Sequence, residues 1–91
     1  MYYSVYVLFS TKDRQLYVGR TNDLGRRLRE HFDGKVTATK HRLPLRFIYS
    51  ETYLKFSDAA RREKYLKGGN GRAGLKIQLQ DILKELHYKN L

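Results

Sequence analysis

Apolar and polar positions alternate with a period of two in three stretches of the chain, and this pattern predicts three β-strands. Residues 2–9 are apolar on both faces, so we expect a central strand that is covered on two sides. A polar turn at 10–13 leads to a second strand over 15–19, and a hairpin is the simplest connection. Residues 45–53 are rich in β-branched and aromatic side chains and predict the third strand.

The register of the hairpin decides whether two tyrosines share a side of the sheet. With a loop of four residues, Phe9 lies opposite Arg14 and Tyr6 lies opposite Tyr17, so both phenols project from one face. A shift by one residue would place them on opposite faces. The sequence leaves this choice open.

A helical spacing of apolar residues first occurs over 23–32, in a segment that is otherwise basic. We expect Asn22 to cap this helix and Gly34 to end it in a left-handed conformation. The row expected to face the core is Leu24, Leu28 and Phe32. The polar, basic residues 35–42 that follow have room for one helical turn.

Two more helices are predicted in the second half of the chain. Ser57 is the expected N-cap of a helix over 58–67, where Glu63 is an acid on an otherwise apolar stripe. The glycine-rich residues 68–71 predict a break. A final amphipathic helix is predicted from residue 72 or 75 to residue 86.

Composition narrows the class of partner. Lys and Arg number 19 and Asp and Glu number 9, so the 91 residues carry a formal charge of +10. This excess indicates a polyanionic partner, with nucleic acid first and an anionic membrane surface second. No apolar run is long enough to span a bilayer. The chain has no Cys, which excludes disulfides and thiolate metal sites and is compatible with the cytoplasm.

Several residues have the chemistry that hydrolysis of a phosphodiester requires, although each alone has a structural explanation. Catalysis needs a base, a cation for the developing charge and usually a metal ion. Glu63 could hold one Mg²⁺ if waters and phosphate fill the other positions. Arg27 suits the phosphoryl oxygens because its guanidinium is always charged and can bind in a bidentate manner.

The proton transfers would fall to aromatic side chains. Tyr6 and Tyr17 are candidate bases, which requires a pKa below the usual value of about 10. His31, one helical turn after Arg27, could share a proton or contact phosphate. Gly19 would allow the backbone and the substrate to approach closely.

Four short motifs follow one another along the chain: Ser4-Val5-Tyr6, Tyr17-Val18-Gly19, Asn22-Asp23-Leu24-Gly25-Arg26-Arg27-Leu28 and Arg61-Arg62-Glu63-Lys64-Tyr65-Leu66-Lys67. Together they resemble the GIY-YIG nuclease superfamily, and most closely its small standalone bacterial members, which resemble the N-terminal catalytic domain of excinuclease C. The resemblance covers about residues 2–86. It implies an α/β (α+β) fold in which helices flank a central three-stranded antiparallel sheet, with residues 1–91 as one nuclease domain.

The resemblance also implies an endonuclease that hydrolyses DNA with one Mg²⁺ or Mn²⁺ ion and leaves a 5′-phosphate and a 3′-hydroxyl. The catalytic set it implies is Tyr6, Tyr17, Arg27, His31 and Glu63, with Glu63 also the metal ligand. We favour Tyr17 as the base and Tyr6 as its support, although the sequence does not decide between them. Expected contacts to nucleic acid are Gly19, Arg20, Lys40 and Arg42.

The sequence departs from the family pattern in a few places. Ser4 replaces the first motif glycine and Val18 replaces an isoleucine, and both suit a strand. Asn70 is the nearest candidate for an asparagine that many members have after the glutamate helix, and it is left out of the catalytic set.

Target choice is not explained by these motifs. Family enzymes usually have an attached DNA-binding domain, and we recognise none in these 91 residues. We therefore expect basic loop residues, a homodimer or a partner protein to select the DNA. Branched or damaged DNA, as met in DNA repair, is the expected substrate. The alternative is a non-catalytic, basic nucleic-acid-binding module with the same fold. A third interpretation is a basic adaptor that docks on an acidic protein.

Overall fold

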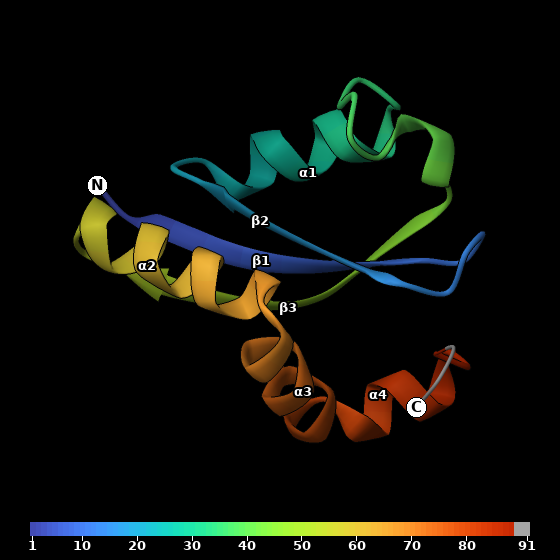
Figure 1. The fold of residues 1–91 in the computed structure, drawn as a ribbon. Coiled ribbons are helices and arrows are strands. Elements are labelled where there is room, and N and C mark those ends of the chain that lie inside the picture. Colours follow the sequence, from blue (N-terminus) through green and yellow to red (C-terminus); the bar gives the residue numbers. More distant parts are fainter. Residues whose placement is uncertain (89–91) are drawn as a thin grey trace.

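The computed structural model describes residues 1–88, and in it the three predicted strands pair into one antiparallel sheet (Figure 1). The strands are β1 (Tyr3–Ser10), β2 (Leu16–Thr21) and β3 (Leu45–Tyr53), in the order β2-β1-β3. Residues 4–10 of the central strand are all buried. The α+β class and the central position of the first strand are therefore confirmed.

The hairpin register differs by two residues from the one considered for a short loop. Tyr6 lies opposite Gly19, and Leu8 lies opposite Tyr17. Because side chains alternate with a period of two, this displacement keeps Tyr6 and Tyr17 on one face of the sheet, as diagonal neighbours.

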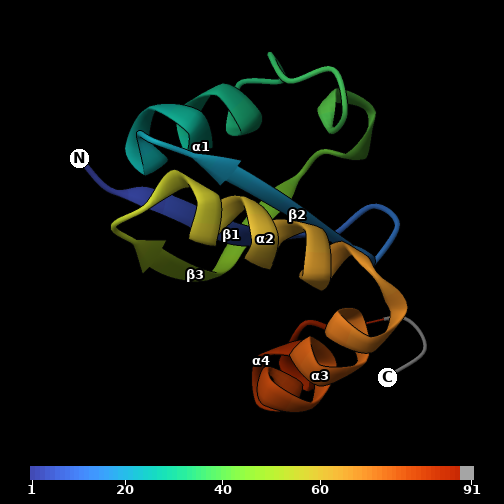
Figure 2. The same cartoon turned by 60° about the vertical axis from the view of Figure 1, so that its left-hand side comes forward.

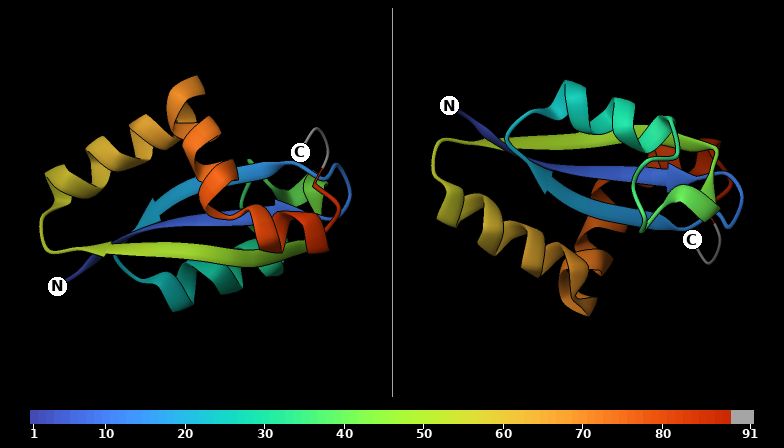
Figure 3. Two further views of the ribbon diagram at one scale, coloured as in Figure 1. Left: turned by 90° about the horizontal axis from the view of Figure 1, so that it is seen from below. Right: turned by 90° about the horizontal axis from the view of Figure 1, so that it is seen from above.

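Helices cover both faces of the sheet, as the turned views show (Figures 2 and 3). On one face lies α1 (Leu24–Phe32), followed by a short 3-10 turn at Lys40–Arg42. The other face is covered by α2 (Phe56–Lys67), α3 (Gly69–Gln78) and α4 (Gln80–Glu85). The sheet consequently separates two apolar clusters.

The larger cluster lies between the sheet and the three later helices. Its buried members are Val5, Val7, Phe9, Leu16, Val18, Ala59, Leu66, Leu75, Leu83 and Tyr88. The smaller cluster lies under α1 and contains Tyr6, Leu8 and Leu45, with Tyr17, Leu24, Leu28 and Leu43 packed against them. Both predicted tyrosines therefore belong to the α1 side of the sheet.

Two details of the first helix differ from the prediction. Asp23, not Asn22, is the N-cap, and its carboxylate accepts a hydrogen bond from the backbone N–H of Arg26. Phe32 is 44% exposed rather than facing the core, because eight residues at 3.6 per turn rotate it by about 80° from Leu24. His31 takes the buried position at this end of α1.

The later helices begin and end at other residues than predicted. α2 starts at Phe56, and its N-cap is Lys55 without a side-chain hydrogen bond, so Ser57 is not the cap. The expected single last helix is divided at Leu79, where the backbone (φ −104, ψ 20) leaves helical values. This bend returns the chain to the sheet, where Leu83 is fully buried. No helix among residues 1–88 is long and apolar enough to cross a bilayer.

The glycine-rich residues 68–71 are not an irregular break. Gly68 turns the chain with an extended backbone (ψ 169), and α3 begins at the next residue. A Cβ at Gly71 would overlap the backbone carbonyl of Tyr65. A glycine is therefore required there by the close approach of α3 to the end of α2.

Candidate active site

Three aromatic rings from separate elements meet beneath α1. The ring centroids of Tyr6 on β1 and Tyr17 on β2 are 6.4 Å apart. The imidazole of His31 on α1 lies 5.5 Å from the first ring and 5.2 Å from the second, with edge-on geometry in both cases. Tyr6 is 1% exposed, whereas Tyr17 is only half-buried. Tyr17 is thus the phenol that water can reach more readily.

Gly19 makes room for this cluster. It faces Tyr6 across the β1–β2 pair, and a Cβ at this position would overlap the hydroxyl end of Tyr6. The same Cβ would also lie 3.0 Å from Cε2 of Tyr17. The structure thus gives Gly19 the task of making room for the Tyr6 ring, and its approach to substrate stays a prediction.

His31 is fully buried and both of its ring nitrogens are engaged. Nε2 lies 2.8 Å from the Tyr6 hydroxyl, and Nδ1 lies 2.7 Å from the hydroxyl of Thr39. Burial and the positive charge of Arg27 lower the pKa of His31 to about 4, so the ring is neutral at pH 7. It therefore positions Tyr6 rather than facing the open side of the site.

Arg27 lies between Tyr6 and Glu30. Its Nη1 donates to Glu30 at 3.0 Å, and its guanidinium lies beside the Tyr6 hydroxyl. Burial raises the pKa of Tyr6 to about 12 despite this cation, so Tyr6 is a neutral phenol at pH 7. The half-exposed guanidinium has donors left for a phosphate.

Glu63 approaches from α2, beside the edge strand β2. Its two carboxylate oxygens are paired with Arg20 at 3.1 Å and with Lys67 at 3.0 Å. Burial alone would raise the pKa of Glu63, but the hydrogen bonds from Lys67 and Arg20 outweigh it and hold the pKa below its usual range. Its negative charge is also close enough to raise the pKa of Tyr6. The electrostatic effect of this charged carboxylate therefore reaches the Tyr6 phenol.

A second carboxylate fixes the rotation of α2. Glu51 on β3 accepts hydrogen bonds from the hydroxyls of Tyr49 and Tyr53 at 2.7 and 2.6 Å. It also forms a bidentate ion pair with Arg62 of α2, in which Nε and Nη2 of Arg62 lie 2.9 and 3.0 Å from the two carboxylate oxygens. Because Arg62 directly precedes Glu63 in α2, this ion pair helps to determine the direction in which the Glu63 side chain points.

Residues 1–88 contain no group of three or more His, Asp or Glu side chains that could hold a metal ion. A metal ion held by Glu63 would therefore have most of its other positions filled by water and phosphate oxygens. An ionised carboxylate suits a hard cation such as Mg²⁺, which keeps several waters when bound. The donor chemistry thus fits one ion, provided that it displaces Lys67 or Arg20 from the carboxylate.

The residues expected to contact nucleic acid have different surroundings. Arg20 is paired with Glu63, and its guanidinium lies 4.4 Å from the ring centroid of Phe56. Lys40 is exposed at the start of the 3-10 turn. Arg42, in contrast, binds Asp13 through two nitrogens at 2.6 and 3.2 Å, and is engaged within the protein.

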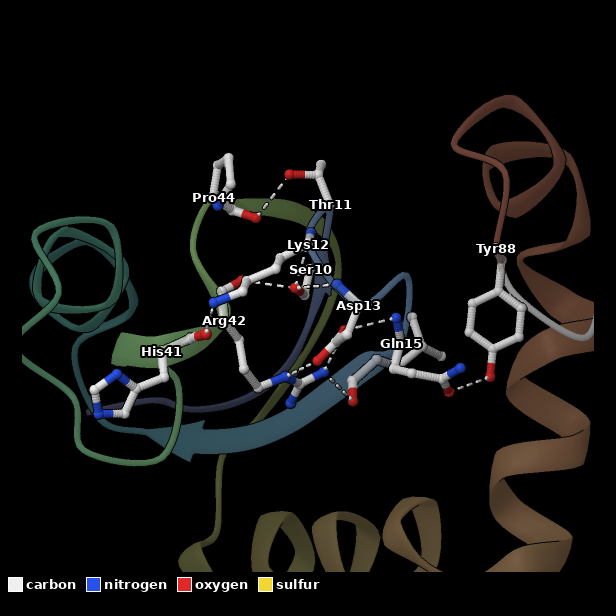
Figure 4. A network of polar contacts seen from close by, with 10 residues as sticks. Ser10, Thr11, Lys12, Asp13, Gln15, His41, Arg42, Pro44 and Tyr88 are labelled. Carbon is white, nitrogen blue, oxygen red and sulfur yellow. Dashed lines mark hydrogen bonds and ion pairs between the residues drawn. The ribbon is translucent and has the colours of Figure 1, made fainter.

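The Arg42 pair belongs to a network that holds the hairpin tip against residues 41–44 (Figure 4). The Ser10 hydroxyl donates to the Arg42 carbonyl at 2.6 Å, and Thr11 donates to the Pro44 carbonyl at 3.1 Å. Lys12 donates to the carbonyl of His41 at 3.1 Å. This network fixes the segment that carries Thr39.

Thr39 is the one residue of the cluster that sequence reasoning missed. It is fully buried and follows His31 by eight residues, in a loop without periodicity. Neither motif nor spacing singles out this threonine from Thr37 in the same loop. Only its contact with the imidazole does so.

Comparison with known proteins places this fold in a family. Residues 2–76 match the family described as "GIY-YIG catalytic domain". The chain belongs to this family, whose members are generally nucleases.

Relatives within the family are small proteins named UPF0213. A UPF0213 protein of Limosilactobacillus reuteri is 39% identical over 88 residues, which cover 90% of this chain and 91% of the relative. One of Bacillus licheniformis is 41% identical over 63 residues, and the match spans 68% of this chain and 64% of that protein. The solution NMR structure of the UPF0213 protein BH0048 from Bacillus halodurans superposes with a TM-score of 0.54 at 30% identity, covering 87% of this chain and 85% of that one.

Proposed function

We propose that this chain is an endonuclease domain that hydrolyses DNA phosphodiester bonds with one divalent metal ion, Mg²⁺ or Mn²⁺, in the cytoplasm. The observation that carries the proposal is the convergence of Tyr6, Tyr17 and Arg27 beneath α1. The charged Glu63 of α2, paired with Arg20 of the edge strand β2, supports it because its charge acts on Tyr6. The formal charge of +10 supports a polyanionic substrate.

Each residue then has one task. Tyr17, the more exposed phenol, first releases its own proton to solvent, and the resulting phenolate takes the proton of the attacking water. Tyr6 supports it with a hydrogen bond to water or phosphate. Arg27 stabilises the charge that develops on the phosphoryl oxygens. Glu63 would hold the metal ion, which supplies a Lewis acid for the leaving oxygen. Arg20 and Lys40 bind the flanking phosphates.

The test is nicking of supercoiled plasmid by purified protein with Mg²⁺, with Mn²⁺ and with EDTA. We expect Arg27→Ala and Glu63→Gln each to lower the nicking rate by about a hundredfold or more while DNA binding persists. Matched controls that remove one charge from exposed positions of the same helices are Arg26→Ala and Asp58→Asn, which should nick like the wild type.

Two results would contradict the proposal. Equal nicking by the wild type and by both site variants would show that a contaminant is responsible. Tight, salt-sensitive binding without cleavage in any divalent metal would favour a non-catalytic nucleic-acid-binding module instead. The same incubation with RNA and with branched DNA would define the substrate.

A further inference from the structure

A short chain of hydrogen bonds leads from the active-site phenol into the protein interior. It runs from the Tyr6 hydroxyl to His31 Nε2 at 2.8 Å, and from His31 Nδ1 to the Thr39 hydroxyl at 2.7 Å. All three side chains are at most 1% exposed. The direction of these two hydrogen bonds decides whether Tyr6 can donate a proton into the site.

The number of protons allows only two arrangements. A neutral imidazole carries one N–H, and the two hydroxyls carry one proton each, so three protons serve two hydrogen bonds. One hydroxyl proton is therefore left over at an end of the chain. Either Thr39 donates to Nδ1 and Nε2–H donates to Tyr6, or Tyr6 donates to Nε2 and Nδ1–H donates to Thr39.

The two ends differ in what they offer to the remaining proton. Within residues 1–88, the Thr39 hydroxyl has His31 as its only hydrogen-bond partner, and the residue is fully buried. A leftover proton there would stay unpaired away from water, which is costly. The Tyr6 hydroxyl is also only 1% exposed, but it lies beside Arg27 and the half-buried Tyr17, on the side of the cluster where the proposed function brings water and phosphate oxygens that can accept its proton.

We propose that Thr39 is a positioning residue that donates to Nδ1 of His31, fixes the Nε2–H tautomer and so leaves the Tyr6 hydroxyl free to donate into the site. In the opposite arrangement the Tyr6 proton would be held by His31, and the phenol could only accept. This inference rests on the proposed function for its catalytic meaning. The tautomer itself can be measured without any nuclease activity.

The first test is the ¹⁵N NMR spectrum of the imidazole ring at pH 7. A His41→Gln/His87→Asn background leaves His31 as the only histidine, and Asn suits position 87 because its backbone has φ 59. We expect Nε2 to show the shift of a protonated nitrogen and Nδ1 that of an unprotonated one. A protonated Nδ1 would overturn the inference.

The second test alters Thr39 with shape retained. Thr39→Val removes the hydroxyl, so Tyr6 can compete to donate to Nε2, and we expect the two nitrogen shifts to move toward each other. Thr39→Ser should restore the wild-type spectrum. An unchanged single tautomer in Thr39→Val would show that Thr39 does not set it.

Nicking separates this inference from the proposed function. We expect Thr39→Val to nick about tenfold more slowly and Thr39→Ser to nick at nearly the wild-type rate, as for loss of one hydrogen bond. Wild-type nicking by Thr39→Val would refute the catalytic meaning. If wild-type protein does not nick at all, the proposed function fails, while the NMR spectra still decide the tautomer.

Discussion

The buried imidazole of His31 should make the folded protein sensitive to mild acid. Its pKa is lowered from 6.5 to about 4 by burial and by Arg27, so the folded state binds this proton less readily than the unfolded state. Stability is therefore complete above pH 6.5 and is lost as the pH falls toward 4. The perturbation to test is His31→Gln, which replaces the imidazole by a side chain that does not ionise.

The size of the effect follows from the shift. A change from 6.5 to about 4 corresponds to about 3 kcal/mol in the free energy of unfolding, of which about 2 kcal/mol is lost between pH 7 and pH 5. His31 is fully buried, so solvent does little to screen the charge of its protonated form. Glu63 and Glu51, whose pKa values are lowered from 4.5, lose their stabilisation mainly below this window.

Urea unfolding at constant ionic strength measures this free energy at pH 7, 6 and 5. We expect wild type to lose about 2 kcal/mol and His31→Gln to be nearly flat, whatever its absolute stability. His41→Gln, which removes an exposed imidazole, should keep the wild-type slope. Equal slopes for wild type and His31→Gln would refute the claim that the fold holds this ring neutral.

Two further pairs of variants test the fold and the basic surface. Gly71→Ala should cost about 2 kcal/mol or more in urea unfolding because its Cβ meets backbone, whereas Gly69→Ala, with no atom within 4 Å of the added Cβ, should be neutral or slightly stabilising. Equal effects would disprove the close approach of α2 and α3. Arg42→Ala should cost about 1–2 kcal/mol of stability through loss of its ion pair with Asp13. Lys40→Ala should leave stability unchanged but weaken DNA binding, and the salt dependence of binding should fall by about one phosphate contact. If Arg42→Ala instead weakened DNA binding and left stability unchanged, Arg42 would be a DNA contact.

Local patterns were enough for much of this protein. The alternation of apolar residues predicted all three strands, because a strand that is packed on a face must repeat with a period of two. The third strand was predicted at 45–53, the bounds that the structure shows. Glu63 was correctly placed on a face of α2 that is otherwise apolar, since helical spacing alone brings it in line with Ala59 and Leu66.

Errors occurred where a distant contact outweighs local preference. Ser57 is a good cap residue, yet α2 begins at Phe56, whose ring packs edge-on against Tyr3, with centroids 5.7 Å apart. Gly71 was interpreted as part of a break because a sequence does not reveal that the carbonyl of Tyr65 lies against it. The ion pair between Arg42 and Asp13 was not predicted, because the two residues lie 29 positions apart.

By itself, the sequence determined the strands, the basic charge and the set of reactive side chains, since each depends on residue type and spacing within a few positions. Tertiary structure alone decided how those side chains are connected. The imidazole of His31 lies between a strand tyrosine 25 residues before it and a loop threonine 8 residues after it. Hydrogen bonds form between groups that the folded chain brings within about 3 Å, and no pattern of neighbours along the chain specifies that distance.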